Sequence, residues 1–295
     1  MMLLIEKYIK YLRYEKNYSL HTEISYSEDL RQFACFIAEH FPDIEIQAVD
    51  SDIIRMWIVS LMENKISPRS VNRKLSSLKS FYRYLLRIGE TTANPAKKVT
   101  GPKTTKPLPA FVSNGDMDSI LDEVQESDSF ESARDHLMIE LFYTTGIRRA
   151  ELIGLKDIDI DFSNKTILVT GKRNKQRVIP ISDNILSQIK QYLETRNSET
   201  ENQSGYLFVK KDGQQLYPML AHRIVTEKLK QIPTLSKTSP HVLRHTFATG
   251  MLNNGADINA VKELLGHSSL AATEIYTHTS FEELKKIYNK AHPRA

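Results

Sequence analysis

The chain contains 295 residues, which at roughly 150 residues per domain indicates about two domains. Hydrophobic residues make up 40% and charged residues 26%, a composition typical of globular proteins. No apolar run reaches the roughly 18 residues that a membrane-spanning helix needs, and the charges of Glu6 and Lys7 come too early for a secretory signal. The single cysteine, Cys35, excludes a disulfide framework and a thiolate metal site within one chain and fits a reducing cytoplasm.

The net charge of +4, from 40 basic and 36 acidic residues, says little about partners, but the basic residues are clustered. Seven lie between Lys65 and Arg87 with no Asp or Glu among them, and a second cluster, GKRNKQR, spans 171–177. Local basic patches can bind phosphate whatever the overall charge. The two clusters are therefore candidate nucleic-acid contacts.

The first hundred residues are predicted to be helical. Helical spacing of apolar residues extends over 3–15, and Ser19 caps a second helix over 21–41. A third helix is expected over 52–64, and Ser67-Pro68 starts a fourth that runs to Arg87. Most basic residues of the fourth helix lie off its apolar stripe, and without a neighbouring acid we interpret them as facing DNA rather than only solvent. With the second cluster, the candidate DNA contacts are Arg69, Arg73, Lys74, Lys79, Arg83, Arg173 and Lys175.

Prolines then interrupt the pattern and predict a linker over 101–110 between domains 1–100 and 111–295. Helices are expected over 129–146 and 147–155. Three strands over 157–162, 166–170 and 176–181 predict an antiparallel meander. The remaining segments are predicted as helices over 185–196, 218–231, 240–253, 255–266 and 268–278, with a short strand over 206–209. The chain closes with a charged amphipathic segment over 281–295. The fold class is mainly α with one small three-stranded antiparallel sheet.

Several polar residues of the second domain have ordinary explanations when each is taken alone. Arg148 and Glu151, three apart, could be a surface ion pair, and Lys172 could be a solvated turn residue. The remaining candidates are His241 with Arg244, His267 and Tyr276, one of 13 tyrosines.

Taken together, these residues match what metal-free transfer of a phosphodiester requires. Guanidinium groups grip the non-bridging oxygens, a histidine accepts the proton of a phenol whose ordinary pKa is roughly 10, and a lysine protonates the leaving oxygen. A covalent phosphotyrosine conserves the energy of the broken bond. There is no GxxxxGK[ST] loop and no carboxylate trio typical of a two-metal site, so we expect neither a nucleotide cofactor nor a metal.

The segments TTGIRRAELIGL, LVTGKRNKQRVIPI and SPHVLRHTFATGMLNNGADINAVKELLGHSSLAATEIYTH, with the ending HPRA, resemble the tyrosine site-specific recombinases of the phage integrase family, and most closely their Xer branch. The resemblance spans almost the whole chain. It implies that Tyr276 is the nucleophile and Lys172 the general acid. It also implies that His241 assists the tyrosine, while Glu151 orients the arginine region. The groups that would hold the transition state are Arg148, Arg244 and His267.

The resemblance also implies a two-domain, C-shaped clamp around double-stranded DNA, and a tetramer on paired half-sites formed with itself or a paralogous recombinase. A septal DNA translocase is a further expected partner and a membrane is not. The segment 281–290 is a candidate for docking onto a neighbouring subunit. The absence of an arm-binding domain and the HPRA ending favour resolution of chromosome dimers. The alternatives are an integrase of a phage or mobile element, a type IB topoisomerase and a DNA-binding protein without catalysis.

Overall fold

The computed structural model describes the chain except residues 105–109, 123–128, 172–173, 202–203, 267–280 and 295. The chain divides into two compact units, Met1–Pro107 and Leu108–Ala295, which we call unit 1 and unit 2. Within the described ranges no helix is both long enough and apolar enough to cross a membrane.

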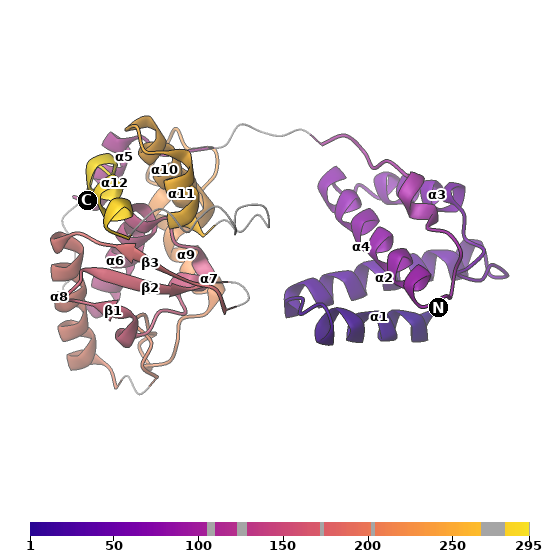
Figure 1. Cartoon of the computed structure of the whole chain (residues 1–295), viewed down its shortest axis with the longest axis horizontal. Coiled ribbons are helices and arrows are strands. Elements are labelled where there is room, and N and C mark those ends of the chain that lie inside the picture. The colour runs from indigo at the N-terminus through magenta and orange to yellow at the C-terminus, as the bar shows by residue number, and fades with distance from the viewer. Residues whose placement is uncertain (105–109, 123–128, 172–173, 202–203, 267–280, 295) are drawn as a thin grey trace. The chain divides into compact units, whose positions relative to one another are not determined.

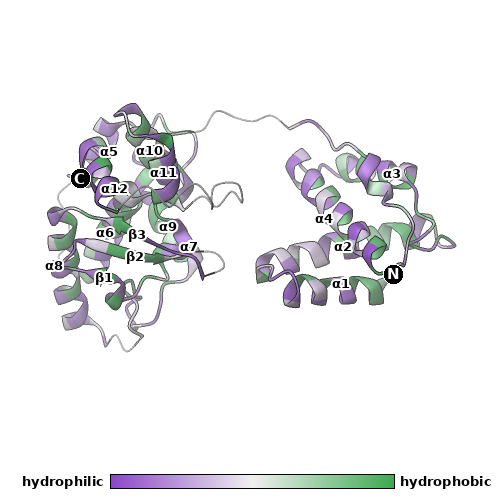
Figure 2. Ribbon diagram, in the orientation of Figure 1, coloured by the Kyte–Doolittle hydropathy of each residue, from purple (hydrophilic) through white to green (hydrophobic). Residues whose placement is uncertain are grey.

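The described residues of unit 1 form four α-helices and one short 3-10 helix, which are α1 (Met2–Tyr14), α2 (Leu20–His40), α3 (Ser51–Glu63), α4 (Pro68–Arg87) and η1 (Pro95–Lys98). Local chemistry sets the starts of three of them. The side chains of Ser19, Asp50 and Ser67 accept hydrogen bonds from backbone N–H groups of the following turn. Figure 2 shows the mixed hydrophilic and hydrophobic surfaces that such amphipathic helices present.

The core of unit 1 lies where α1 and α2 pack together and α4 packs on both. Tyr8, Trp57 and Phe81 are almost fully buried in it. Ala96 and Val99, which precede the linker expected over 101–110, are buried in the same core. The amide of Asn72 also donates to the carbonyl of Pro102 at 2.8 Å. Residues up to Pro102 therefore belong structurally to unit 1.

Unit 2 is mainly helical, as predicted, with one three-stranded sheet (Figure 1). Its helices before the sheet are α5 (Asn114–Leu121), α6 (Phe130–Thr145) and α7 (Arg149–Leu152). The sheet consists of β1 (Ile160–Asp161), β2 (Thr166–Thr170) and β3 (Gln176–Pro180). The helices after it are α8 (Asp183–Glu199), α9 (Pro218–Leu229), α10 (Pro240–Asn253), α11 (Ile258–Leu265) and α12 (Phe281–Ala291).

The sheet is the expected antiparallel meander in the order β1-β2-β3, and its register pairs Ile167 with both Ile160 and Ile179. The first strand is shorter than predicted. A 3-10 turn, η2 (Asp157–Asp159), precedes it, because the Asp159 side chain accepts from the backbone N–H of Lys156 at 2.9 Å. The strand predicted over 206–209 is wrong, since that segment forms only isolated bridges of Tyr206 with Lys156 and of Val209 with Gln215.

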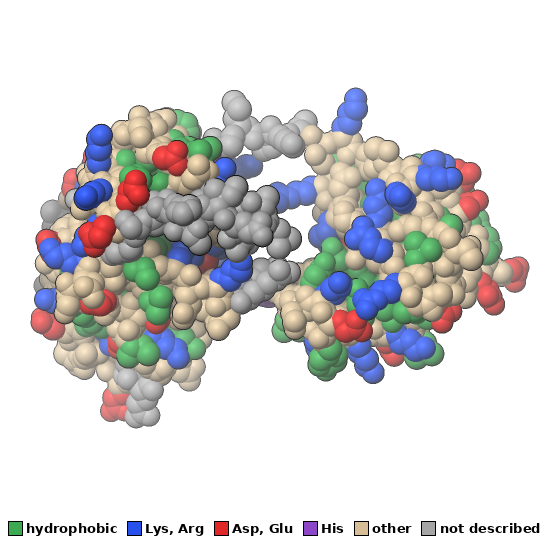
Figure 3. Space-filling model, viewed as in Figure 1, with side chains coloured by type: hydrophobic (Ala, Val, Ile, Leu, Met, Phe, Trp, Pro, Cys, Tyr) green, Lys and Arg blue, Asp and Glu red, His purple; other side chains and the backbone are tan. Residues whose placement is uncertain are grey.

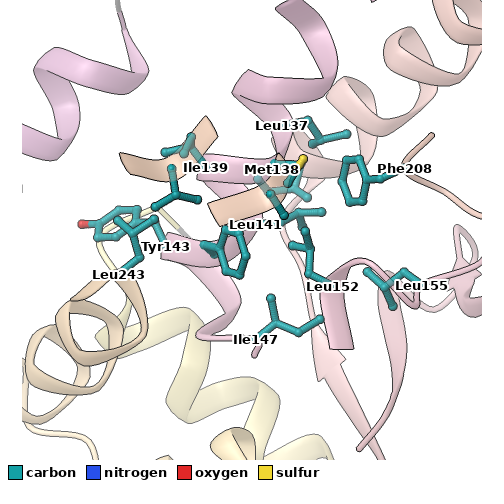
Figure 4. Packing of buried hydrophobic residues seen from close by; sticks show 14 of the residues in the cluster. Leu137, Met138, Ile139, Leu141, Tyr143, Ile147, Leu152, Leu155, Phe208 and Leu243 are labelled. Carbon is teal, nitrogen blue, oxygen red and sulfur yellow. The ribbon is translucent and has the colours of Figure 1, made fainter. Parts of the chain in front are cut away.

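Helix α6 is the centre of the unit 2 core, and eleven of its sixteen residues are buried. A helix that is buried on nearly all sides needs partners all round it. Figure 4 shows Leu137, Met138 and Leu141 of α6 surrounded by apolar side chains from other parts of the unit, among them Leu152 and Phe208. This packing fixes the carboxyl end of α6, where the candidate site begins.

Helices α10, α11 and α12 form a second, smaller apolar cluster in unit 2. Tyr288 of α12 is fully buried against it, and Leu284 is 5% exposed. The guanidinium of Arg294 forms ion pairs with Asp118 of α5 and with Asp122, the residue that caps the carboxyl end of α5. In this single chain the segment expected to dock onto a neighbour therefore packs on its own unit.

Candidate active site

Arg148 lies at the amino-terminal cap of α7, directly after the turn that ends α6. Its Nη1 donates to Oε1 of Glu151 at 2.7 Å, and its backbone N–H donates to Oε2 at 3.0 Å. The spacing of three residues predicted this pair, but the geometry is that of a helix cap rather than of two residues within one helix. The Arg148 side chain is 39% exposed, so its guanidinium can still reach a ligand.

Glu151 is buried and accepts from two arginines. Besides Arg148, Nη2 of Arg177 in β3 donates to its Oε2 at 2.8 Å. Burial alone would raise the pKa of Glu151, but the hydrogen bonds from Arg177 and from Arg148 outweigh it, so the pKa lies below its ordinary value. Glu151 is therefore an ionised anchor for both guanidinium groups at neutral pH.

Arg244 extends from α10 into the site and is 9% exposed. Its Nη1 donates to the carbonyl of Gly146 at 2.5 Å, and its Nη2 donates to the carbonyl of Leu265 at 2.7 Å. Burial, together with the neighbouring charge of Arg148, lowers its pKa to about 10. Arg244 is thus still protonated at neutral pH, and its charge lies close to that of Arg148.

The carboxyl end of α11 joins these residues. The last carbonyls of a helix have no partner within it and carry partial negative charge. Three successive carbonyls here each accept from a different arginine. Leu264 accepts from Nε of Arg177 at 2.7 Å, Leu265 from Arg244, and Gly266 from Nη2 of Arg148 at 3.0 Å. Three guanidinium groups therefore meet at one helix end, directly before His267 in the sequence.

Two glycines are needed for this arrangement. Gly146 ends α6 with a φ of +59°, and a Cβ there would lie 2.5 Å from Cδ1 of Phe247. Gly266 ends α11 with a φ of +63°, and a Cβ there would lie 3.2 Å from the Arg177 side chain. Both positions use left-handed backbone that other residues rarely adopt.

Four further candidate catalytic residues were expected from the sequence. His241 lies in the first turn of α10, three residues before Arg244, with an exposed side chain. Lys172, His267 and Tyr276 lie outside the described residues. The structure therefore brings Arg148, Glu151 and Arg244 together, with His241 on the helix that carries Arg244.

The basic residues of α4 divide into two kinds. Arg69 and Arg83 have exposed side chains and Lys79 a partly exposed one, and no ion pair involves any of the three within the described part of the chain. In the space-filling view, Lys and Arg side chains are scattered over the visible face of unit 1 (Figure 3). This is the placement that a phosphate-binding surface needs.

Lys74 does not fit the predicted DNA contacts. It is 5% exposed, and its Nζ donates to Oδ1 of Asp29 at 3.0 Å and to the Gln32 side chain. Arg73, which is exposed, also pairs with Asp29. The sequence of α4 contains no acid, but α2 supplies one from a distant position. In unit 2, Lys175 is exposed in the turn between β2 and β3, and Arg173 lies outside the described residues.

Sequence reasoning missed Arg177 as a site residue. The alternation of β3 places it on the same side as buried Ile179, although arginine is seldom directed inward without a partner. That inward position was a signal available in the sequence. Its partners, Glu151 and the carbonyl of Leu264, become visible only in three dimensions.

Comparison with known proteins defines the class. Residues 111–283 match the phage integrase family, and residues 5–89 match the SAM-like amino-terminal domain of phage integrases. The chain belongs to the phage integrase family and is a tyrosine recombinase, a class of DNA strand-exchange enzymes.

Several similar curated proteins are named tyrosine recombinase XerC, and two of them serve as examples. That of Chlorobaculum parvum is 37% identical over 99% of this chain and 94% of its own length. That of Listeria innocua is 38% identical over 98% of this chain and 97% of its own length. Two solved structures share the fold. One is a XerH recombinase bound to a palindromic difH substrate, with a TM-score of 0.74 and 24% identity over 97% of this chain and 83% of that one. The other is the Tn1549 transposon integrase with transposon right-end DNA, with a TM-score of 0.70 and 22% identity over 96% of this chain and 97% of that one.

Proposed function

We propose that this protein is a site-specific recombinase that cuts and rejoins DNA through a 3′-phosphotyrosine on Tyr276. The observation that carries the proposal is the meeting of Arg148 and Arg244 at the carboxyl end of α11. Each guanidinium uses part of its donor set on protein carbonyls. Arg148 remains partly exposed, which leaves donors for the oxygens of a phosphate.

The proposed cleavage step conserves charge and protons. The Tyr276 oxygen attacks phosphorus and gives its proton to His241, while the bond from phosphorus to the 5′ oxygen breaks. Lys172 protonates that oxygen as it leaves. Arg148, Arg244 and His267 hold the negative charge of the transition state. Rejoining is the reverse reaction with the 5′ hydroxyl of another strand, so neither metal nor nucleotide is consumed.

We assign the two units different parts in this reaction. Unit 1 binds the DNA backbone through the exposed arginines of α4, and unit 2 performs the chemistry. The clamp that they form closes around double-stranded DNA with paired half-sites. Four subunits act together in the cytoplasm, and they are either all copies of this chain or copies of this chain and a paralogous recombinase. A septal DNA translocase controls their activity.

Resolution of chromosome dimers is the biological role that we propose. It is supported by relatives that are 36–38% identical over nearly the whole chain and are named XerC. Integration of a mobile element is the second candidate, since the transposon integrase has the same fold at 22% identity. The two roles share their chemistry and differ in the DNA site.

The test is to trap the covalent intermediate on a nicked suicide DNA site from the same genome. The wild type should give a DNA-linked band on a denaturing gel, and Tyr276→Phe should bind the site but give no band. Tyr276→Phe removes only the attacking oxygen, so loss of the band identifies the nucleophile. A band that persists in the variant would assign the chemistry to another residue.

A further inference from the structure

Arg177 is a buried arginine that the proposed reaction does not use. Its side chain is 12% exposed, and it joins two elements that are far apart in the sequence. Nη2 donates to Glu151 at 2.8 Å and Nε donates to the carbonyl of Leu264 at 2.7 Å. Burying a guanidinium is costly unless its donors are satisfied, and here two of its three nitrogens, Nε and Nη2, each donate to an acceptor of the protein.

The surroundings of Arg177 show which segments it holds together. A Cβ on Gly266 would lie 3.2 Å from its Cδ and Nη1, so its stem packs on that glycine. On the other side, a Cβ on Gly171 would lie 3.0 Å from Oε1 of Glu151 and 3.9 Å from Nη1 of Arg177. Gly171 immediately precedes Lys172, and Gly266 immediately precedes His267. Arg177 thus lies beside both of the points where the chain continues into these residues, and Glu151 lies beside the first of them.

We propose that Arg177 is a positioning residue that fixes the spacing between the turn carrying Lys172 and the end of α11 that leads to His267. This inference rests on the proposed function. Lys172 protonates the oxygen that leaves, whereas His267 holds the charge on phosphorus, so the two segments must keep a set separation while the bond breaks. A misplacement of about 1 Å can lower a rate by about 100-fold.

A planar guanidinium is required for this role. It can donate to Leu264 from Nε and to Glu151 from Nη2 at the same time, whereas the single ammonium of lysine is a point donor without that fork. Arg177→Lys should therefore retain the charge beside Glu151 but lose one of the two connections. Arg177→Ala should lose both.

The experiment measures single-turnover cleavage of two DNA sites by the full chain. One site is ordinary, and the other has sulfur in place of the 5′ bridging oxygen at the scissile bond. A thiol has a pKa of roughly 8.5, so a sulfur leaving group departs without a proton. Lys172→Ala shows how much the cleavage rate recovers on the sulfur-containing site when only the general acid is lost. Arg196→Ala is the matched control, because Arg196 is a buried arginine that pairs with Asp157 at 2.8 Å outside the site.

We expect Arg177→Ala to bind DNA like the wild type, to cleave the ordinary site about 100-fold more slowly, and to regain about tenfold on the sulfur site. Arg177→Lys should fall between Arg177→Ala and the wild type. Arg196→Ala should lower thermal stability without a specific gain on sulfur. Wild-type cleavage by Arg177→Ala, or an equal loss on both sites, would overturn the inference. A wild type that forms no covalent complex would instead count against the proposed function.

Discussion

Single residues in unit 2 show how burial sets protonation. His292, in the ending HPRA, is 5% exposed and stacks on Phe247 and Tyr288 with ring centroids 5.5 Å apart in each case. Its Nδ1 accepts from the backbone N–H of Arg294 at 3.1 Å, so the proton is on Nε2, which faces the carbonyl of Tyr143 at 3.3 Å. A second proton, on Nδ1, would face the backbone N–H of Arg294, so two donors would meet without an acceptor between them.

His292 therefore predicts a pH dependence of stability. Burial, and to a smaller degree the charge of Arg294, lowers the pKa of His292 to about 4 from its ordinary 6.5. The unfolded chain then binds the proton more readily than the folded chain does. The contribution of the buried, neutral His292 to the free energy of unfolding is therefore fully present above about pH 6.5 and is lost as the pH falls towards 4. The loss is on the order of 3 kcal/mol. Urea unfolding at several pH values should show a smaller decrease for His292→Phe than for the wild type, and parallel curves would contradict the assignment.

The sequence predicted side-chain contacts only between residues that are close together along the chain. The spacing of Arg148 and Glu151 indicated their pairing, and a three-residue separation is read directly from the chain. It did not predict that Glu151 also binds Arg177, 26 positions away, or that Lys74 pairs with Asp29, 45 positions away. Such pairs depend on how elements pack, which periodicity within one element does not contain.

Among the elements, α4 combines a buried polar contact with an exposed basic face. Lys74 is directed inward to Asp29, whereas Arg69 and Arg83 extend from the helix into solvent. The same helix therefore stabilises unit 1 through one set of charges and would contact DNA through another. These two roles can be separated by substitution.

Arg69→Ala and Arg83→Ala should each weaken DNA binding and reduce the slope of log affinity against log salt by about 1, because each removes one phosphate contact. Unfolding of unit 1 should be nearly unchanged. Lys74→Met should leave the salt slope as it was but destabilise unit 1 by about 3 kcal/mol, since Asp29 remains buried with fewer partners. The check is fluorescence-detected DNA binding from low to moderate salt. A smaller salt slope in Lys74→Met would show that Lys74 contacts a DNA phosphate after all.

At this scale the sequence predicted most helices well. Ser67-Pro68 and the apolar stripe placed α4 at Pro68–Arg87, where the structure has it. The helix α5 was missed, although Ser113 caps it and Met117 and Ile120 lie on its buried face. The segment 206–209 failed as a strand because its apolar residues are buried among loops and helices, and burial alone does not distinguish these settings.

At the scale of the whole molecule, the two units have separate cores. The unit 1 cluster ends at Val99, and the large unit 2 cluster begins at Val112. A unit with its own core can unfold on its own. Composition and the prolines indicated two domains with a linker from residue 101, but not that Asn72 would hold Pro102 on unit 1, because that contact joins residues 30 positions apart.

The single tryptophan provides a measurement of this independence. Trp57 is 2% exposed in the core of unit 1, so its fluorescence reports the unfolding of unit 1, whereas circular dichroism reports both units. Arg196→Ala should shift the dichroism transition downward without moving the fluorescence transition, and Lys74→Met should move the fluorescence transition. If Arg196→Ala shifted both transitions equally, the units would unfold as one.

The junction at the end of α11 has a consequence for how this protein can vary. Each of the three arginines there is a side-chain donor, but every acceptor on α11 is a backbone oxygen, which all amino acids carry. A mutation can delete a donor and cannot delete an acceptor. The side chains that specify the junction are therefore the three arginines at positions 148, 177 and 244 and their anchor Glu151, all far in the sequence from α11, whereas α11 itself needs only the glycine that ends it.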